Sequence, residues 1–415
     1  MAGNESSTNN VVTMLENLLR ILKEEHVFDR SGDQRVVQFA HPEVLQNEIS
    51  FSLDKNPVEE KQLETLIRQI IQYSVKTSNP HFHNQLYGGV DEYGLVGSWL
   101  TDVLNTSQYT YEVAPVFTLI EHEVIKKSLQ LVGYPSMPLA DGIMCPGGSI
   151  ANMYAMMMAR YMRFPETKRS GISCFGKSLI CLTSEDSHYS ISKAANWLGI
   201  GIDNVCKVKT DEYGRMKVDD LKEIIKKMKN DGHLPFFLNA TAGTTVLGAI
   251  DPLLEIAEIC HSENIWLHVD VDAMKFWLMW KARGTIGLGL LVDNAMHCVE
   301  YFFKQIQETP GFRLVQSNYE LCTICFWYIP SKMLGQPETS NWWKQLYNTT
   351  IEIKKRLTLR GSVMIGYTPL LHRQECGNFF RMVVTCQPPP TESSMDFVIK
   401  EIQEVALKLD EESSS

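Results

Sequence analysis

The sequence predicts an α/β protein with a mostly parallel sheet, followed by a smaller α+β domain. Between about residues 85 and 270, short β-rich runs alternate with amphipathic helices, which is typical of a parallel sheet covered on both faces. From about residue 295 onward, strands and helices follow a different order. The 415 residues are 44% apolar and 21% charged, as in ordinary globular proteins, so a disordered or fibrous chain is excluded.

The elements follow from apolar spacing, taken in chain order. Apolar residues recur at three- and four-residue intervals in 11–28 and 58–75, which predicts two polar-faced helices. In the central part we expect strands at 178–184, 204–210, 235–241 and 265–270, and helices at 189–198, 221–230 and 252–263. Strands at 311–316, 323–329 and 379–384 are expected in the last part. These elements predict an N-terminal helical segment over 1–84, a large α/β domain over 85–290 and a small domain over 291–410.

Charge and cysteine usage exclude several classes of protein. The net charge of −10 and the lack of a basic stripe argue against nucleic acid as a partner. No apolar run approaches the roughly 18 residues of a membrane span. The first ten residues lack the features of a secretory or transit peptide, so we expect a cytosolic protein. The ten cysteines are scattered, and the pair Cys322 and Cys325 is interpreted as part of a buried strand rather than a metal or redox site.

Polar groups follow successive strands, where ligands gather in α/β sheets. Gly-Gly-Ser at 147–149 opens a helix, and its glycines and exposed N–H groups favour a phosphate. His188 follows the strand 178–184, where an imidazole can stack on a flat ring or move a proton. Taken singly, the first is also an ordinary capped helix start, and the second a hydrogen-bonded turn residue.

Two more groups complete this series. The run Asn-Ala-Thr-Ala-Gly-Thr-Thr, ending at Thr245, offers small hydroxyl side chains that leave room for a ligand. Asp270 ends the strand 265–270, where a carboxylate can keep a pyridine nitrogen protonated. The alternatives are an ordinary strand exit for the first and a helix cap for the second.

The order of the four groups resembles the fold-type-I pyridoxal-phosphate (PLP) enzymes, and specifically the group II amino-acid decarboxylases. That family includes glutamate, cysteine sulfinate and acidic amino-acid decarboxylases. The resemblance extends from about residue 70 to 408, and its further motifs are NQLYGG at 84–89, YTYEVAPV at 109–116, CFWYIP at 325–330 and NFFR at 378–381.

The resemblance implies a role for each matching residue. Gly148 and Ser149 would hold the phosphate of the cofactor, and His188 would stack on its ring and assist proton transfer. Thr245 would lie beside the ring, and Asp270 would pair with the ring nitrogen.

It also implies a substrate site and an assembly. Gln85 would lie near the substrate, and Arg381 would bind a carboxylate or sulfinate, for which its planar fork is suited. The alternatives are a satisfied loop amide and a surface arginine. Tyr87 resembles the cysteine sulfinate and aspartate branch more than the glutamate branch, so the products would be hypotaurine or β-alanine, on the route to taurine in the first case. Family members are dimers with active sites at the interface.

The sequence departs from the family directly after Asp270. The family holds its cofactor through the lysine of an Asn-Pro-His-Lys sequence, and this chain contains none. Residues 271–282, VDAMKFWLMWKA, resemble instead the family segment that follows the lysine and the mobile catalytic loop. We therefore expect that one contiguous block is missing at the 270/271 junction, as a skipped exon or an imperfect gene model would produce.

The missing block leads to three expectations. The chain should have little or no activity, because Lys275 and Lys281 are expected on a helix and are poor substitutes for the Schiff-base lysine. The sheet should also lose strands and expose an apolar edge. An alternative role is a non-catalytic short form that pairs with full-length subunits and modulates them. An aminotransferase on the same fold would need the same lysine.

Overall fold

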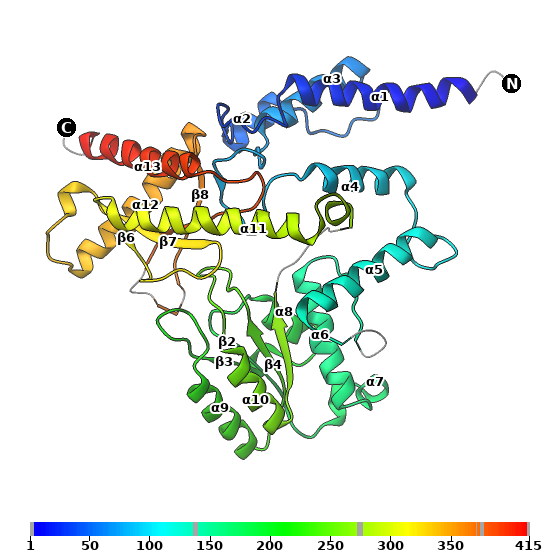
Figure 1. Ribbon diagram of the computed structural model, residues 1–415, viewed down its shortest axis with the longest axis vertical. Coiled ribbons are helices and arrows are strands. Elements are labelled where there is room, and N and C mark those ends of the chain that lie inside the picture. Colours follow the sequence, from blue (N-terminus) through cyan, green and yellow to red (C-terminus); the bar gives the residue numbers. More distant parts are fainter. Residues whose placement is uncertain (1–3, 136–139, 272–276, 371, 374–376, 413–415) are drawn as a thin grey trace. The chain divides into compact units, whose positions relative to one another are not determined.

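The computed structural model describes residues 4–135, 140–271, 277–370, 372–373 and 377–412. The chain divides into two compact units, and each is considered by itself (Figure 1). Unit 1 comprises residues 1–91, 289–315 and 324–415, and unit 2 comprises residues 92–288 and 316–323. The bounds of the three predicted domains stay predictions.

Unit 2 contains a four-stranded sheet in the order β3-β2-β4-β5, and every neighbouring pair is parallel. Its strands are β2 (Leu179–Ser184), β3 (Val205–Val208), β4 (Leu234–Thr241) and β5 (Trp266–Asp270). Its helices are α4 (Glu92–Leu104), α5 (Pro115–Val132), α6 (Gly148–Arg163), α7 (Thr167–Ser170), α8 (Ser190–Trp197), α9 (Val218–Asn230) and α10 (Leu253–Glu263). The expected alternation of strands and helices is confirmed.

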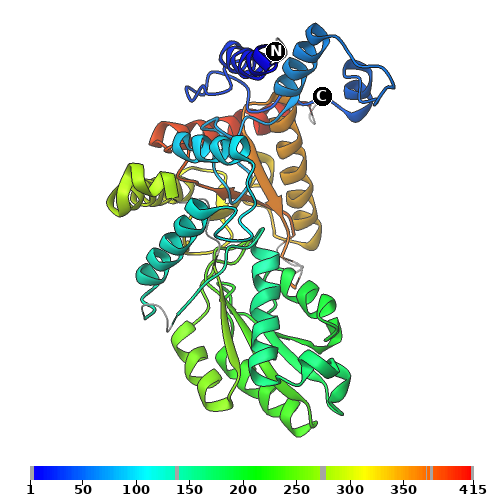
Figure 2. The same ribbon diagram turned by 90° about the vertical axis from the view of Figure 1, so that its right-hand side faces the viewer.

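Alternate residues of the unit 2 strands pack against helices on opposite faces of the sheet (Figures 1 and 2). Ile180 and Leu182 of β2 belong to one core with side chains of α9 and α10. Leu179 and Cys181 of the same strand belong to another core with side chains of α6 and α8. The period of two along the strand therefore produces two apolar layers, and the carboxyl ends of the strands are left for polar groups.

Strand β5 is the last strand of this sheet and is less buried than its neighbour. All residues of β4 except its first are buried, whereas no residue of β5 is fully buried. Trp266, at the start of β5, is 39% exposed, and Val271, just after it, is 61% exposed. The sheet therefore ends at an open apolar edge, as expected from a block missing after Asp270.

Unit 1 contains a five-stranded mixed sheet in the order β1-β8-β9-β7-β6. β1 pairs with β8 in parallel, whereas β8 with β9 and β6 with β7 are antiparallel. The strands are β1 (Phe82–His83), β6 (Phe312–Leu314), β7 (Thr323–Tyr328), β8 (Met364–Thr368) and β9 (Phe379–Val383). The helices are α1 (Asn4–Glu24), α2 (Pro42–Glu48), α3 (Glu60–Tyr73), α12 (Ser340–Arg360) and α13 (Glu392–Glu412).

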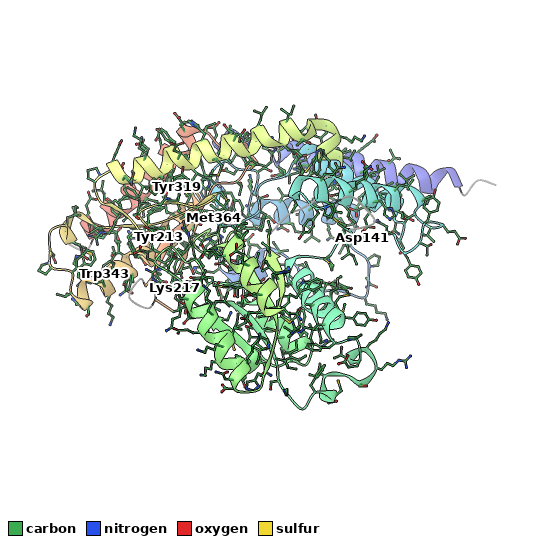
Figure 3. The ribbon with its side chains drawn as sticks, turned by 60° about the horizontal axis from the view of Figure 1, so that its bottom comes forward. Asp141, Tyr213, Lys217, Tyr319, Trp343 and Met364 are labelled. Carbon is green, nitrogen blue, oxygen red and sulfur yellow. The ribbon has the colours of Figure 1, made fainter. Side chains whose placement is uncertain are left out.

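In two stretches after residue 277, the chain passes between the two units. Helix α11 (Trp277–Glu308) bends at Gly284, whose φ of 64° is not helical, and its residues contribute to both units. The segment 316–323 belongs to unit 2, where Gln316 Nε2 donates to the carbonyl of Tyr213 at 3.0 Å. The hydroxyls of Tyr213 and Ser317 are 3.3 Å apart. Tyr213 is labelled in Figure 3.

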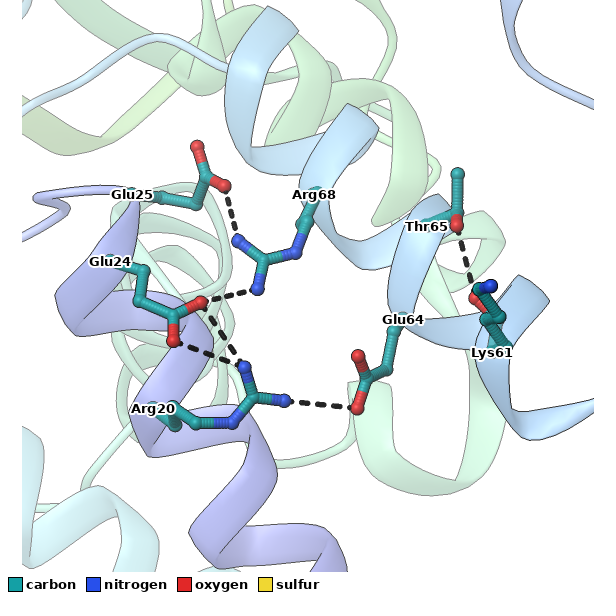
Figure 4. A network of polar contacts seen from close by, with 7 residues as sticks. All are labelled: Arg20, Glu24, Glu25, Lys61, Glu64, Thr65 and Arg68. Atoms are coloured by element: carbon teal, nitrogen blue, oxygen red, sulfur yellow. Dashed lines mark hydrogen bonds and ion pairs between the residues drawn. The ribbon is translucent and has the colours of Figure 1, made fainter.

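Helices α1 and α3 of unit 1 are joined by an exposed network of ion pairs (Figure 4). Arg20 binds Glu24 at 3.1 Å and Glu64 at 3.0 Å, and Arg68 binds Glu24 and Glu25. The two predicted N-terminal helices are thus confirmed, and their charged faces contact one another.

The structure also describes two other predicted features. Cys325 is buried in β7, and burial raises the pKa of its thiol to about 12, in agreement with a structural role in a strand. Cys322 precedes β7 and is half-buried, so the buried-strand interpretation is confirmed for Cys325 alone. In the part of the chain that the structure describes, no helix is both long enough and apolar enough to cross a membrane.

Candidate active site

The helix start at residues 147–149 forms an open backbone cradle in unit 2. Gly147 has φ of 100°, a conformation that favours glycine, and it precedes α6, which begins at Gly148. A Cβ built on Gly147 or Gly148 would meet no atom within 4 Å. Since the first N–H groups of a helix have no partner within the helix, this cradle can receive an anion such as a phosphate.

A buried amide, Asn152, connects this helix with the end of β5. Its Nδ2 donates to Ser190 Oγ at 2.9 Å and to Asp270 Oδ2 at 3.0 Å. Its Oδ1 lies 2.8 Å from His268 Nε2. Asn152 is only 3% exposed, so it is a fixed support for the half-buried Asp270 carboxylate.

These contacts also determine which ring nitrogen of His268 carries a proton. A carboxylate can only accept, so the Asn152 amide must present its nitrogen to Asp270 and its oxygen to His268. Nε2 of His268 must therefore carry a proton and donate to Asn152 Oδ1. Burial lowers the pKa of His268, partly opposed by Asp270, and the imidazole is thus a neutral donor in this chain of hydrogen bonds.

His188 lies between the end of β2 and the start of α8. Its Nδ1 accepts a hydrogen bond from the backbone N–H of Ser190 at 3.3 Å, and its ring lies 4.1 Å from that of Tyr189. Burial lowers the pKa of His188, although the charge of Asp270 acts in the opposite direction. The structure therefore brings His188 and Asp270 within electrostatic range of each other and keeps the imidazole neutral near pH 7.

Thr245 lies in a turn that follows β4, and its neighbours hold that turn in place. Thr244 Oγ1 accepts a hydrogen bond from the N–H of Ala249 at 2.9 Å, and the N–H of Gly248 donates to the carbonyl of Thr244. Asp251 accepts from the N–H groups of Met216 and Thr241, both at 2.7 Å. Thr244 and Asp251 are therefore structural, while Thr245 is half-buried in the turn.

The residues at the start of α6 and at the ends of β2 and β5 fit the phosphate and the ring of PLP. The cradle at Gly147 and Gly148 has space where a side chain would otherwise stand. His188 offers a flat ring, and Asp270 offers a carboxylate with one oxygen held by Asn152. An orienting hydrogen bond of this kind keeps a carboxylate ready for a cationic partner.

The two expected substitutes for the covalent lysine are not part of this arrangement. Lys281 is on α11, as predicted, and it lines a different cavity together with Glu123, Val124, Lys127 and Trp280. Lys275 lies outside the described residues. Besides burial, the positive charge of Lys193 lowers the pKa of His188. Lys193 Nζ lies 4.3 Å from the centre of the Tyr189 ring.

The two predicted substrate residues, Gln85 and Arg381, line one cavity of about 310 Å³ in unit 1. Arg381 is on β9, directly opposite Gly366 of β8. The remaining lining residues are Asn84, Lys354, Gly366, Tyr367 and Thr368. Of the described residues that line this cavity, two are cationic and none is a carboxylate, so it suits an anionic ligand.

Two residues of these sites were not predicted from the sequence. Asn152 was included only as part of the apolar-rich helix that follows Ser149. Its position three residues after Ser149, on the same side of the helix, is the signal that could have identified it. Lys354 is one of several basic residues on α12, and nothing in their spacing along the sequence sets Lys354 apart.

Comparison with known proteins agrees with these observations. The family described as "Pyridoxal-dependent decarboxylase conserved domain" matches residues 42–272 and 271–329. Acidic amino acid decarboxylase GADL1 of Xenopus tropicalis is 35% identical, with 95% of this chain and 93% of the relative covered. Cysteine sulfinic acid decarboxylase of Homo sapiens is also 35% identical, with 91% and 92% covered.

Solved structures show the same relationship. The crystal structure of mouse CSAD has a TM-score of 0.90 and 34% identity, and the match covers 96% of this chain and 99% of that one. Oryza sativa TDC with PLP, at 15% identity, shares the fold with a TM-score of 0.83. The predicted fold type is thus confirmed.

The matches also contain a discontinuity where the sequence departs from the family. The two segments matched by the family description meet at residues 271–272. The alignment with the Xenopus relative runs over 482 residues, more than the 415 of this chain, so the relative has residues without a counterpart here. PLP is the cofactor of these enzymes, which are carboxy-lyases, and the chain belongs to the PLP-dependent decarboxylase family.

Proposed function

We propose that unit 2 binds PLP through non-covalent contacts and that the chain has little or no decarboxylase activity of its own. The observation that carries this proposal is the hydrogen bond from buried Asn152 to Asp270, at the end of the strand where the family match is interrupted. This hydrogen bond holds a carboxylate that could serve the cofactor ring. The carboxylate lies directly before the position where the family match is interrupted.

Each residue of the site has a definite task in this proposal. The N–H groups at Gly148 and Ser149, with the Ser149 hydroxyl, bind the phosphate. Asp270 would keep a proton on the ring nitrogen, and His188 would offer its imidazole to the ring, with Thr245 as a further neighbour of the cofactor. When bound, PLP supplies an electron-accepting ring for the bond that releases carbon dioxide from an amino acid.

The absence of turnover follows from the missing lysine. In the family, a lysine amine holds the cofactor covalently and positions it for exchange with the substrate amine. Here Lys281 lines another cavity, and residues 271–282 continue without the Asn-Pro-His-Lys sequence. The retained groups can bind a phosphate and a ring, but they provide no amine at the required place.

We further propose that the substrate class is the acidic amino acids, with cysteine sulfinate or aspartate preferred to glutamate. Arg381 and Gln85 line a cationic cavity, and Tyr87 resembles the cysteine sulfinate branch. The curated relatives carry the matching names, acidic amino acid decarboxylase and cysteine sulfinic acid decarboxylase. A place in taurine synthesis and a cytosolic location are part of the same proposal.

Reduction with borohydride in the presence of PLP tests whether the cofactor is bound covalently. We expect that PLP binding, followed by absorbance, is saturable and is reversed by dialysis. We also expect that the peptide map shows no single modified lysine. Specific modification of Lys193, Lys275 or Lys281 would contradict non-covalent binding. Carbon dioxide release from cysteine sulfinate at a rate comparable to mouse CSAD would contradict the absence of turnover.

A second candidate function is modulation of a full-length subunit. Apolar side chains of α4 and α5 are exposed in the single chain, including Val96, Val103, Val116 and Leu119, each more than half exposed. Such a surface favours association, either with a second copy or with a full-length relative. Co-expression with a tagged full-length subunit would support this role if the two co-purify and the activity per full-length subunit falls.

A further inference from the structure

Lys354 lies on α12 and lines the same cavity of unit 1 as Arg381. It comes from a different element than Arg381, which is on β9, so the two cations reach the cavity from a helix and from a strand. The lining also includes the amide side chains of Asn84 and Gln85, which can donate hydrogen bonds.

The surroundings of Lys354 differ from those of other basic residues on its helix. Lys355 pairs with Glu352 at 3.8 Å, Arg356 pairs with Glu352 at 3.1 Å, and Arg360 pairs with Glu401 at 3.4 Å. Among the residues that the structure describes, Lys354 has no carboxylate partner. It is nevertheless half-buried, and burial lowers the pKa of its ammonium group.

A half-buried cation without a partner is unfavourable in the free protein, because burial removes water without supplying an opposite charge. Such groups are more frequent at ligand sites, where the ligand supplies the missing charge. The cavity offers that possibility, since none of the described residues that line it is acidic.

The backbone beside Lys354 leaves space for a ligand. Gly366 lies opposite Arg381, and a Cβ added there would come within 3.3 Å of Asn84 Oδ1 and of the Arg381 carbonyl. A side chain at residue 366 would therefore press on the Asn84 side chain and on the Arg381 carbonyl, both of which belong to residues that line the cavity. Glycine at this position keeps the cavity open.

We infer that Lys354 is a second ligand-binding cation beside Arg381, so that this cavity takes a small molecule with two acidic groups. The class is an amino acid with an acidic side chain, and in this respect the inference rests on the proposed substrate class. Arg381 binds one oxyanion through its fork, and Lys354 binds the other as a point charge.

Calorimetric titration of the whole chain without PLP tests this directly. The ligands are L-aspartate and L-alanine, which differ by one carboxylate. We expect wild type to bind aspartate at least tenfold more tightly than alanine. K354M should weaken aspartate binding tenfold or more and reduce the preference over alanine. K354R should restore most of the affinity, because it returns the positive charge.

K355M is the matched control, since Lys355 is the next residue and pairs with Glu352 on the surface. It should change the affinity for aspartate less than twofold. The thermal midpoint of K354M should equal or exceed that of wild type, because an unpaired cation is removed. A lower midpoint together with lost binding would show a structural role and overturn the inference.

Two further results would overturn the inference. One is equal affinity for aspartate in K354M and wild type, and the other is a wild type that does not distinguish aspartate from alanine. In either case, saturation with PLP and the borohydride map report on unit 2 separately. Failure at Lys354 is therefore distinguishable from failure of the proposed cofactor binding.

Discussion

The two sheets of this protein place their functional residues on strands of different kinds. Arg381 is in the middle of β9, which lies between β8 and β7, and the other four residues of that strand are buried. Asp270 ends β5, which is the last strand of its sheet and has no fully buried residue. The inner strand is held by pairing on both sides, whereas the edge strand is held by pairing on one side and by the side chain of Asn152.

This difference indicates which part of the molecule the missing block affects. The cavity at Arg381 is built on strands of a complete five-stranded arrangement. Asp270, the carboxylate that we propose for the cofactor, lies directly before the junction, on a strand that has one neighbour in the described structure. Its position therefore depends on fewer main-chain contacts and on one buried amide.

The largest expected effect comes from shortening apolar side chains beside the two functional residues. Met382, next to Arg381, is fully buried, so M382A should lower the free energy of unfolding by about 2–5 kcal/mol. Leu267 on β5 is only half-buried, so L267A should cost less than about 2 kcal/mol. Urea unfolding followed by circular dichroism measures both, and equal losses would contradict the contrast between inner and edge strand.

Acid should weaken unit 1 through His83 on β1. His83 is 3% exposed, its Nδ1 donates to the Val383 carbonyl, and burial lowers its pKa to about 4. As pH falls below 6.5, the unfolded chain takes up the proton first. Stability is therefore complete above pH 6.5 and is lost towards pH 4, by about 3 kcal/mol.

Urea midpoints between pH 7.5 and 4 would measure this loss. H83N keeps a donor for the Val383 carbonyl and cannot titrate, so its midpoint should vary less with pH than that of wild type. The exposed His122, changed to Asn, is the control and should leave the dependence unchanged. A wild-type profile that H83N reproduces would show that His83 does not cause the acid sensitivity.

Removing the support of Asp270 should have a smaller effect on stability and a specific effect on the cofactor. N152A leaves Asp270, His268 and Ser190 without the amide, which should cost about 1–3 kcal/mol. Affinity for PLP should fall at least tenfold, while aspartate binding to unit 1 stays unchanged. N196A, an exposed asparagine on α8, is the control for both titrations.

The smallest effect is expected at the ion pairs of α1 and α3. Arg20 and its carboxylate partners are largely exposed, and water and salt weaken such pairs. R20Q should leave the urea midpoint unchanged at physiological salt. A clear shift would mean that this network holds α1 and α3 together more strongly than its exposure suggests.

The sequence was sufficient for most elements and for the discontinuity. The central strands and helices were predicted because their signal is local: apolar spacing changes between two and about 3.6 residues. His188, Thr245 and Asp270 could be placed near the ends of strands because parallel strands bring their carboxyl ends to one edge. Gly148 and Ser149 begin α6 instead, and no strand directly precedes that helix among the described residues. The junction after Asp270 was visible because the motif sequence itself is interrupted.

The order of the strands and the partners of the functional groups came only from the tertiary structure. Asn152 and Asp270 are 118 residues apart, and Lys354 reaches the cavity of Arg381 from a helix on which Lys355, Arg356 and Arg360 pair with carboxylates. Local periodicity contains no information about such contacts, because they depend on which faces pack together. Sequence therefore determined the elements, the family and the interruption, while packing decided that β5 is an edge and that one amide holds its carboxylate.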